Sequence, residues 1–242
     1  MDFQKSNLRA LFINCSIKKD KTGSHTQLLM DKVANIMNTQ GVTIEHVYAL
    51  DHQIAFGMIK DGNDEGQADD WPKIQQKIID ADILVIGTPI WLGVKSSVAT
   101  QVIERMYAYS SETNDKGQYL YYGKAGGCVI TGNEDGIKHC GMDILYALQH
   151  IGYTVPPQAD CGWIGEAGPG PSYGDTEWNG ESLDSPAGFD NEFTNRNATF
   201  MAWNLMHTAK MLKDAGGIPA VGNTTESWQH VTNAKSDNPE YQ

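Results

Sequence analysis

The sequence predicts an α/β fold in which helices cover both faces of a doubly wound, five-stranded parallel sheet. Three short apolar runs, at 8–13, 83–86 and 127–130, each end in a loop of small and polar residues. Between these runs, apolar residues recur at helical spacing, which is typical of strand–helix–strand units. Since such units place the carboxyl ends of parallel strands at one edge of a sheet, we expect the three loops to meet there.

The first part of the chain predicts strands at 8–13 and 42–47 with one helix between them. The apolar stripe of that helix consists of Leu29, Val33, Ile36 and Met37. Gly41 follows as a helix stop. Residues 51–70 are polar and rich in glycine and aspartate, so we expect a long excursion there. The stripe of the next helix consists of Trp71, Ile74 and Ile78, with Pro72 tolerated in its first turn.

Two further strand–helix pairs and a fifth strand complete the predicted sheet. The third strand is predicted at 83–86, and the helix after it buries Val98, Val102 and Met106. The fourth strand is predicted at 127–130, and the next helical stripe consists of Met142, Leu145 and Leu148. Thr154-Val155 begins a more weakly marked fifth strand. For five strands we expect the order 2-1-3-4-5, in which the ligand site lies between strands one and three.

The last third of the chain predicts a long irregular loop and a closing helix. Residues 162–190 are rich in Gly, Pro, Ser and acids, and their aromatic residues favour a packed loop over a disordered one. The helix at 191–213 has an inner side formed by Met201, Leu205 and Leu212. We therefore predict one domain over residues 1–215 and a polar, loosely attached C-terminal tail over 216–242.

Composition limits the partners that the chain can have. The net charge of −12 argues against nucleic acid and against an anionic membrane surface. The apolar stretch near the N-terminus is too short for a signal peptide, and no run approaches the roughly 20 apolar residues that span a bilayer. The four cysteines lie far apart without C-x-x-C spacing, so we expect free thiols, no metal site and a cytoplasmic protein.

The loop after the first strand has the composition of an anion site. Ser24, His25 and Thr26 open a helix, where backbone N–H groups and the helix dipole favour an anion, and Ser16 can reach the same point. A second interpretation is that Ser24 only caps the helix, with Gln27 completing a capping box. The loop has no G-K-[ST] sequence, so a nucleoside triphosphate is not expected.

The other two loops have the composition of a site for a flat ring. Residues 88–93 carry no charge and present Trp91 and Leu92, which would suit the face and edge of a tricyclic ring. Alternatively, these two residues belong to the core or to a subunit interface. Residues 131–136 provide glycines for close backbone approach and an Asp-Gly turn into a helix, although they could form a turn and nothing more.

These residues resemble the NAD(P)H-dependent FMN reductase family of flavodoxin-like proteins over residues 8–155. The resemblance is carried by Ser16 with residues 23–26, by residues 88–93 and by residues 131–133. It implies that FMN binds with its phosphate at the first loop and its isoalloxazine ring between the other two. The family often has a shorter phosphate loop with an early arginine, where this chain has Lys18, Lys19 and Lys21. The predicted cofactor residues are Ser16, Lys18, Ser24, His25, Thr26, Pro89, Ile90, Trp91, Leu92, Gly93, Thr131, Gly132, Asn133, Glu134 and Gly136.

The resemblance also implies a chemistry and an assembly. The flavin would take a hydride from NAD(P)H as co-substrate and pass electrons to a small acceptor such as a quinone or another aromatic molecule. No catalytic side chain is required, although His139 is a candidate proton donor unless it is only a surface histidine. The loop from Trp163 to Tyr173 could roof the flavin, in its own or a partner subunit. A homodimer or homotetramer is expected.

Three rival functions remain, and one of them is a regulatory flavoprotein with no turnover. A flavodoxin-type electron-transfer protein would hold FMN without oxidising NAD(P)H directly, but it would not need the long loop or the closing helix. A serine hydrolase is suggested by the match of residues 170–174 to G-x-S-x-G, with Ser172 as nucleophile. That motif works at a sharp strand-to-helix turn, and the flanking sequence predicts neither element.

Overall fold

The computed structural model describes residues 3, 6–18, 21–165 and 170–227, and it confirms the predicted sheet. Five parallel strands lie in the order β2-β1-β3-β5-β6. They are β2 (Thr43–Tyr48), β1 (Arg9–Asn14), β3 (Ile83–Trp91), β5 (Ala125–Thr131) and β6 (Asp160–Trp163). Because β4 (Val94–Lys95) only pairs antiparallel with β3, this order is the predicted 2-1-3-4-5.

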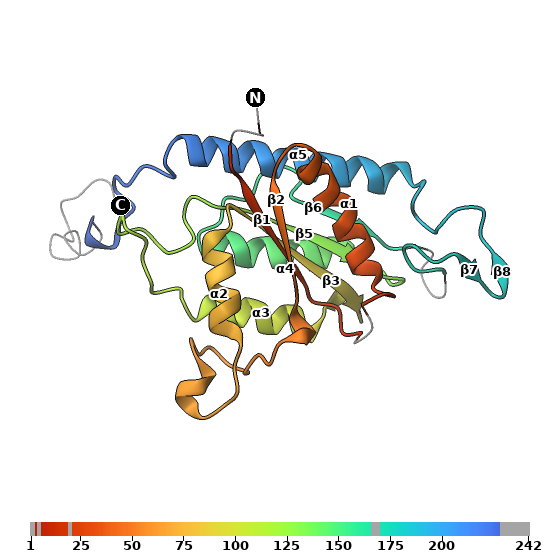
Figure 1. Cartoon of the computed structure of the whole chain (residues 1–242), viewed down its shortest axis with the longest axis horizontal. Coiled ribbons are helices and arrows are strands. Elements are labelled where there is room, and N and C mark those ends of the chain that lie inside the picture. Colours follow the sequence, from red (N-terminus) through yellow and green to blue (C-terminus); the bar gives the residue numbers. More distant parts are fainter. Residues whose placement is uncertain (1–2, 4–5, 19–20, 166–169, 228–242) are drawn as a thin grey trace.

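Helices cover both faces of the sheet, as Figure 1 shows. On one face lie α1 (His25–Thr39) and α5 (Glu192–Asp214); on the other lie α2 (Trp71–Asp80), α3 (Ser97–Tyr107) and α4 (Ile137–His150). Because side chains alternate in direction along each strand, a strand contributes residues to the core on both faces of the sheet. In β1, for example, Leu11 and Ile13 join the core beneath α2, α3 and α4, while Ala10 and Phe12 join the core beneath α1 and α5.

The predicted fifth strand was wrong. Thr154 makes only an isolated bridge to Ala125, and the fifth strand is β6, which pairs with β5 from Cys128↔Asp160 to Thr131↔Trp163. β6 contains Gly162, where a Cβ would lie 2.9 Å from the carbonyl oxygen of Ile130. Glycine allows this close approach because it has no side chain. The same glycine is one reason why the sequence of this segment predicted a loop.

The predicted stripe of α4 was also wrong in part. Met142 is 68% exposed, while Cys140, Ile144 and Leu148 are fully buried. The buried residues recur at four-residue spacing and include a cysteine, which behaves as a small apolar side chain inside proteins. In α5 the prediction holds for Met201 and Leu205, which are buried, whereas Leu212 is half-buried.

β3 is longer than predicted and turns back as a hairpin. The strand continues beyond Ile86 to Trp91, so that four of the six residues of the predicted second loop, 88–91, are strand. Leu92 and Gly93 form the turn with φ values of 51° and 75°, the left-handed conformation that two-residue hairpin turns use. Trp91 and Leu92 stand at the hairpin tip, 46% and 92% exposed, so neither belongs to the core of this chain.

A buried ion pair holds the excursion at 51–70, which begins at the end of the short 3-10 helix η1 (Ala49–Asp51) and contains a second one, η2 (Gly62–Glu65). Arg105 Nη2 lies 2.6 Å from Asp69 Oδ2, and both side chains are fully buried. Burial by itself would raise the pKa of Asp69. Hydrogen bonds from Arg105 and from the backbone N–H groups of Gly62, Ala55 and Trp71 outweigh it and lower the pKa to about 2.

The described part of the C-terminal segment is attached to its own chain. Gln118 Nε2 donates to the carbonyl oxygens of Ile218 and Pro219 at 3.3 and 3.2 Å, and Thr225 N donates to the Gly117 carbonyl at 2.9 Å. Residues 216–227 are thus held against the loop at 114–118, in contrast to the expected loose tail. Residues 228–242 of that predicted tail lie outside the described residues.

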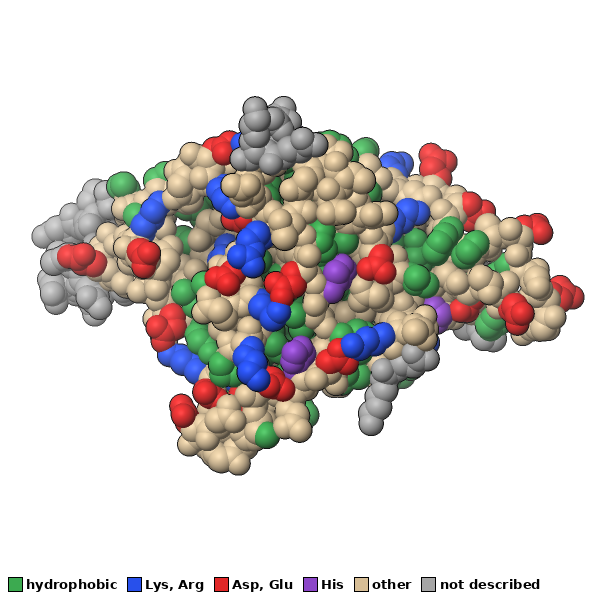
Figure 2. Space-filling view, in the orientation of Figure 1, with side chains coloured by type: hydrophobic (Ala, Val, Ile, Leu, Met, Phe, Trp, Pro, Cys, Tyr) green, Lys and Arg blue, Asp and Glu red, His purple; other side chains and the backbone are tan. Residues whose placement is uncertain are grey.

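The surface over β1 and β2 mixes both signs of charge (Figure 2). Lys77 pairs with Glu45, Lys21 pairs with Asp51, and Lys213 Nζ lies 2.9 Å from Asp82 Oδ2. On this face of the molecule, basic side chains therefore alternate with carboxylates. None of the helices in the described part of the chain combines the length and apolar character needed to cross a lipid bilayer.

Candidate functional site

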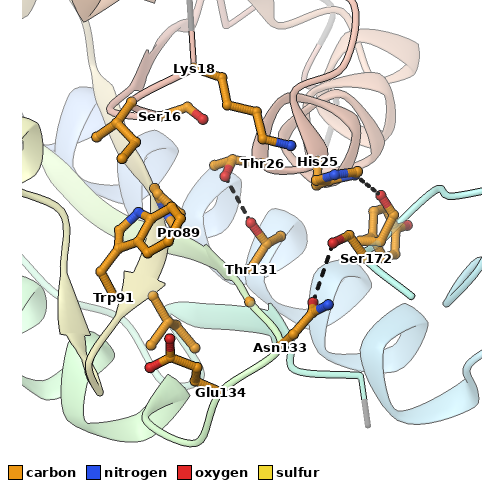
Figure 3. A pocket seen from close by; sticks show the side chains of 14 residues that line it. Ser16, Lys18, His25, Thr26, Pro89, Trp91, Thr131, Asn133, Glu134 and Ser172 are labelled. Atoms are coloured by element: carbon orange, nitrogen blue, oxygen red, sulfur yellow. Dashed lines mark hydrogen bonds between the residues drawn. The ribbon is translucent and has the colours of Figure 1, made fainter. Parts of the chain in front are cut away.

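A cavity of about 280 Å³ lies at the carboxyl ends of β1, β3 and β5, where the three loops meet as predicted (Figure 3). Thr26 Oγ1 and Thr131 Oγ1 lie 2.7 Å apart and join the first loop to the third. The lining residues are Ser16, Ile17, Lys18, His25, Thr26, Pro89, Ile90, Trp91, Thr131, Gly132, Asn133, Glu134, Ser172 and Tyr173.

Four predicted cofactor residues do not line the cavity: Ser24, Leu92, Gly93 and Gly136. Ser24 is buried as the N-cap of α1, where its Oγ accepts from Gln27 N at 3.2 Å. The reciprocal half of the predicted capping box is missing, since the Gln27 side-chain oxygen accepts instead from Asn14 Nδ2 at 2.9 Å. Leu92 projects from the hairpin tip into solvent.

Gly93 and Gly136 form the junction between the second and third loops. A Cβ on Gly136 would lie 2.7 Å from the Gly93 carbonyl oxygen, and Gly136 has a φ of 133°. The two backbones therefore approach more closely than any residue with a side chain would allow. These two glycines therefore support the wall of the cavity but do not themselves line it.

One end of the cavity has the chemistry of an anion site. His25 and Thr26 are the first two residues of α1, and their backbone N–H groups have no intrahelical acceptor. Ser16 is 5% exposed and lines the cavity, and its hydroxyl has no hydrogen-bond partner among the described residues. The Lys18 ammonium likewise makes no ion pair within that part of the chain, and Figure 3 shows it extending toward His25. Of the other loop lysines, Lys21 is paired with Asp51 and Lys19 lies outside the described residues.

The other end of the cavity is a mainly apolar slot. Pro89, Ile90 and Trp91 from β3 form one side of it. Gly132 packs directly against Ile90, where a Cβ would come within 2.9 Å of Ile90 Cβ. Glu134 brings a carboxylate to this end, at the opposite side from Lys18 (Figure 3). The cavity is thus polarised, with the Lys18 ammonium and helix N–H groups at one end and a mainly apolar slot at the other.

The predicted cofactor residues did not include Ile17, Ser172 or Tyr173, although the loop from Trp163 to Tyr173 was expected to lie over the site. Ser172 and Tyr173 belong to residues 170–175, which we call the strap because it lies along the cavity between β6 and β7 (Glu177–Trp178). Asn133 Nδ2 donates to the Gly170 carbonyl at 2.5 Å, and Ser172 Oγ donates to Asn133 Oδ1 at 3.4 Å. The aromatic residues of the loop predicted that it packs, and the hypothesis that the loop from Trp163 to Tyr173 lies over the site agrees with Tyr173 lining the cavity.

The side chains of the strap favour binding over nucleophilic chemistry. Ser172 does not lie at a strand-to-helix turn, so the hydrolase motif lacks its structural context. Burial raises the pKa of Tyr173 to about 12, which keeps its phenol protonated at neutral pH. Trp163 packs edge-on against Tyr173, with ring centroids 6.2 Å apart, and does not itself line the cavity.

The remaining candidates for chemistry lie away from the cavity or are inert. His139 is exposed on α4 and does not line the cavity. Burial raises the pKa of the Cys15 and Cys161 thiols, so both are uncharged at neutral pH and are poor nucleophiles. The cavity can therefore bind and orient a ligand with its own polar groups, and none of the described residues that line it is an activated nucleophile.

Comparisons with known proteins agree with this geometry. The family model for NADPH-dependent FMN reductases matches residues 8–163. The 8-demethyl-8-aminoriboflavin-5'-phosphate synthase of Streptomyces davaonensis is 35% identical over 214 residues, covering 86% of this chain and 79% of that protein. The crystal structure of RosB with bound 8-demethyl-8-formylriboflavin-5'-phosphate has a TM-score of 0.81 at 32% identity, covering 96% of this chain and 88% of the other.

Another relative is much longer than this chain. A Mycobacterium bovis protein named divalent metal cation transporter MntH is 52% identical over 230 residues, which cover 90% of this chain but 32% of that protein. This chain therefore spans about a third of that relative. A flavone reductase structure with 12% identity and a TM-score of 0.53 shares the fold.

Proposed function

The chain belongs to the NADPH-dependent FMN reductase family, and from this premise we propose that its cavity binds riboflavin 5'-phosphate (FMN) for use in an NAD(P)H-dependent oxidoreductase reaction. The observation that carries the proposal is the polarised cavity at the ends of β1, β3 and β5. An anion site and a flat apolar slot in one cavity match a ligand that joins a phosphate to an aromatic ring system.

The residues present fit the phosphate of FMN. Two free helix N–H groups, the Ser16 and Thr26 hydroxyls and the Lys18 ammonium provide donors at one end of the cavity. In a chain of net charge −12, a phosphate must be held by such local donors because the overall field repels it. The bond between Thr26 and Thr131 ties this end to the ring end.

The residues present also fit the ring. Pro89, Ile90 and Trp91 would cover one face of the isoalloxazine, and Tyr173 on the strap would close the far side. When bound, the flavin supplies the two-electron chemistry of hydride transfer. The chain's own residues position the ring, exclude water from it and, through Asn133, hold the strap beside it.

We extend the proposal to the substrates and the assembly. NAD(P)H is the electron donor, and a small aromatic molecule such as a quinone is the acceptor, since the half-exposed Trp91 leaves an apolar entrance to the slot. The chain forms a homodimer or homotetramer. Exposed Leu92, Met142 and Tyr146, from the hairpin tip and the outer face of α4, supply apolar surface that a second copy could cover.

A second candidate function is chemical modification of the flavin itself. Its support is that the similarity to RosB covers 96% of this chain and the similarity to the Streptomyces davaonensis synthase covers 86%, whereas the family model ends at residue 163. Under this proposal the riboflavin phosphate is a substrate, and the strap encloses the part of the ring that is altered. A flavodoxin-type electron carrier is the third option, in which FMN is bound but NAD(P)H is not oxidised directly.

One experiment separates these functions. FMN-loaded protein is titrated anaerobically with NADH and with NADPH while its visible absorption is followed, and the flavin is then recovered for mass spectrometry. Rapid bleaching with recovery of unchanged FMN supports the oxidoreductase. A bound flavin that does not bleach favours the electron carrier, and a flavin of altered mass favours modification. Failure to bind flavin would overturn the proposed function.

A further inference from the structure

We propose that His25 selects the phosphorylated flavin by taking up a proton when the phosphate binds, with Asp175 of the strap as its counter-charge. The inference rests on the proposed function, because it assigns a role within the cavity proposed to hold the phosphate of FMN. It makes His25 a specificity-determining residue that distinguishes FMN from unphosphorylated riboflavin, and it links the phosphate end to the strap.

The hydrogen bond between α1 and the strap defines the tautomer of His25. His25 Nδ1 lies 2.8 Å from the carbonyl oxygen of Tyr173. A carbonyl oxygen can only accept, so Nδ1 must carry a hydrogen whether the ring is neutral or charged. In the neutral ring Nε2 is consequently a lone-pair acceptor, and any additional proton must bind there.

A neutral His25 is the wrong partner for a phosphate. The ring lines the cavity beside the α1 N-terminus, where an anion would sit (Figure 3). An acceptor nitrogen facing phosphate oxygens is repulsive, while a protonated Nε2 donates a charge-assisted hydrogen bond. Binding of a phosphate dianion therefore draws a proton from solvent: a new Nε2–H bond forms, and the complex gains one positive charge.

The charges around His25 favour this uptake. Asp175 Oδ1 lies 3.7 Å from His25 Nδ1, and both side chains are only partly exposed. Asp175 is itself held by Ser172 N, which donates to Oδ2 at 2.7 Å. The other charged groups that line the cavity are Lys18, which opposes a second cation, and Glu134 at the far end of the slot. A bound dianion and Asp175 together outweigh Lys18.

Asn and Gln substitutions separate the two ring nitrogens. Asparagine at position 25 places an amide N–H near the position of Nδ1 and can keep the bond to the Tyr173 carbonyl, while it removes Nε2. Glutamine can place a neutral donor nearer the position of Nε2. Asp175→Asn removes the counter-charge but keeps a side-chain oxygen that can accept from Ser172 N.

The test is calorimetric titration of the whole chain with FMN and with riboflavin at pH 7.5, in buffers of different ionisation enthalpy. At this pH a free phosphate monoester is already almost fully dianionic, because its second pKa is about 6, so uptake reports on the protein. We expect wild type to take up protons when FMN binds, on the order of one per bound phosphate dianion, and none with riboflavin. His25→Asn and His25→Gln should both abolish the uptake, and Asp175→Asn should reduce it.

Each outcome has a definite meaning. FMN binding without proton uptake, or uptake that persists in His25→Asn, overturns the role of His25 and leaves the proposed function standing. Equal uptake with riboflavin overturns it as well, and that comparison needs only wild-type protein. Unchanged uptake in Asp175→Asn overturns the part assigned to Asp175. Failure of wild type to bind either flavin overturns the proposed function and this inference together.

Discussion

Replacing Gly136 with alanine should destabilise the junction of the second and third loops more than adding a methyl group at any other position there. Gly136 has a φ of 133°, a conformation that costs a residue with a side chain about 1–3 kcal/mol. The added Cβ would also lie 2.7 Å from the Gly93 carbonyl oxygen and 2.9 Å from its Cα, an overlap with backbone that costs about 1–3 kcal/mol more. We therefore expect Gly136→Ala to lower the free energy of unfolding by about 2–6 kcal/mol, out of a total that is typically about 5–15 kcal/mol.

Gly180→Ala is the matched control. Gly180 has a φ of 83°, but a Cβ there meets nothing within 4 Å. Its substitution should cost only the conformational part, about 1–2 kcal/mol. Urea unfolding followed by tryptophan fluorescence gives both values, and titration with FMN gives the affinity. Gly136→Ala should also weaken FMN binding because the loops flanking the slot separate, whereas Gly180→Ala should not.

Because Gly136 lies so close to Gly93, the free energy of unfolding should fall more in Gly136→Ala than in Gly180→Ala. If Gly136→Ala is no more destabilising than Gly180→Ala, the close approach to Gly93 is relaxed at no cost and the reasoning is refuted. If Gly136→Ala is destabilised but binds FMN with unchanged affinity, the junction supports the fold and does not shape the cavity.

Four further predictions concern the buried ion pair, its dependence on pH, the bond between Thr26 and Thr131, and the ring end of the cavity. Arg105→Met should destabilise the chain by about 3–5 kcal/mol in urea unfolding, since it leaves the buried Asp69 carboxylate without its cation, and a loss below about 1 kcal/mol would contradict this. Because the pKa of Asp69 is lowered to about 2, its contribution is fully present above pH 4 and should be lost as pH falls toward 2, which urea unfolding at stepped acidic pH measures against the same series for Asp69→Asn. Thr131→Val should cost about 1–3 kcal/mol by leaving the buried Thr26 hydroxyl unpaired, and a neutral result would show that another acceptor replaces it. Trp91→Ala should weaken FMN binding by about 2- to 10-fold through lost aromatic contact, as fluorescence titration would show; an unchanged affinity would mean that the ring does not lie against Trp91.

The order of local signals along the chain was sufficient to predict the architecture and the place of the site. Apolar runs at β1, β3 and β5 alternate with helical stripes, and this alternation leaves few ways to arrange a parallel sheet. Because strand ends at one sheet edge must come together, the small polar residues after each run predicted the cavity without any knowledge of contacts. Ser16, Thr26, Ile90 and Gly132 line it for that reason.

Tertiary structure alone decided the features whose causes are distant in sequence. β6 forms around Gly162 because a neighbouring strand approaches there, although the local sequence resembles a loop. The strap reaches the cavity because His25 and Asn133, 148 and 37 residues away from their partners, bind its backbone. Local propensity reports what a segment can form, whereas the partner that a polar loop finds depends on the whole packed chain.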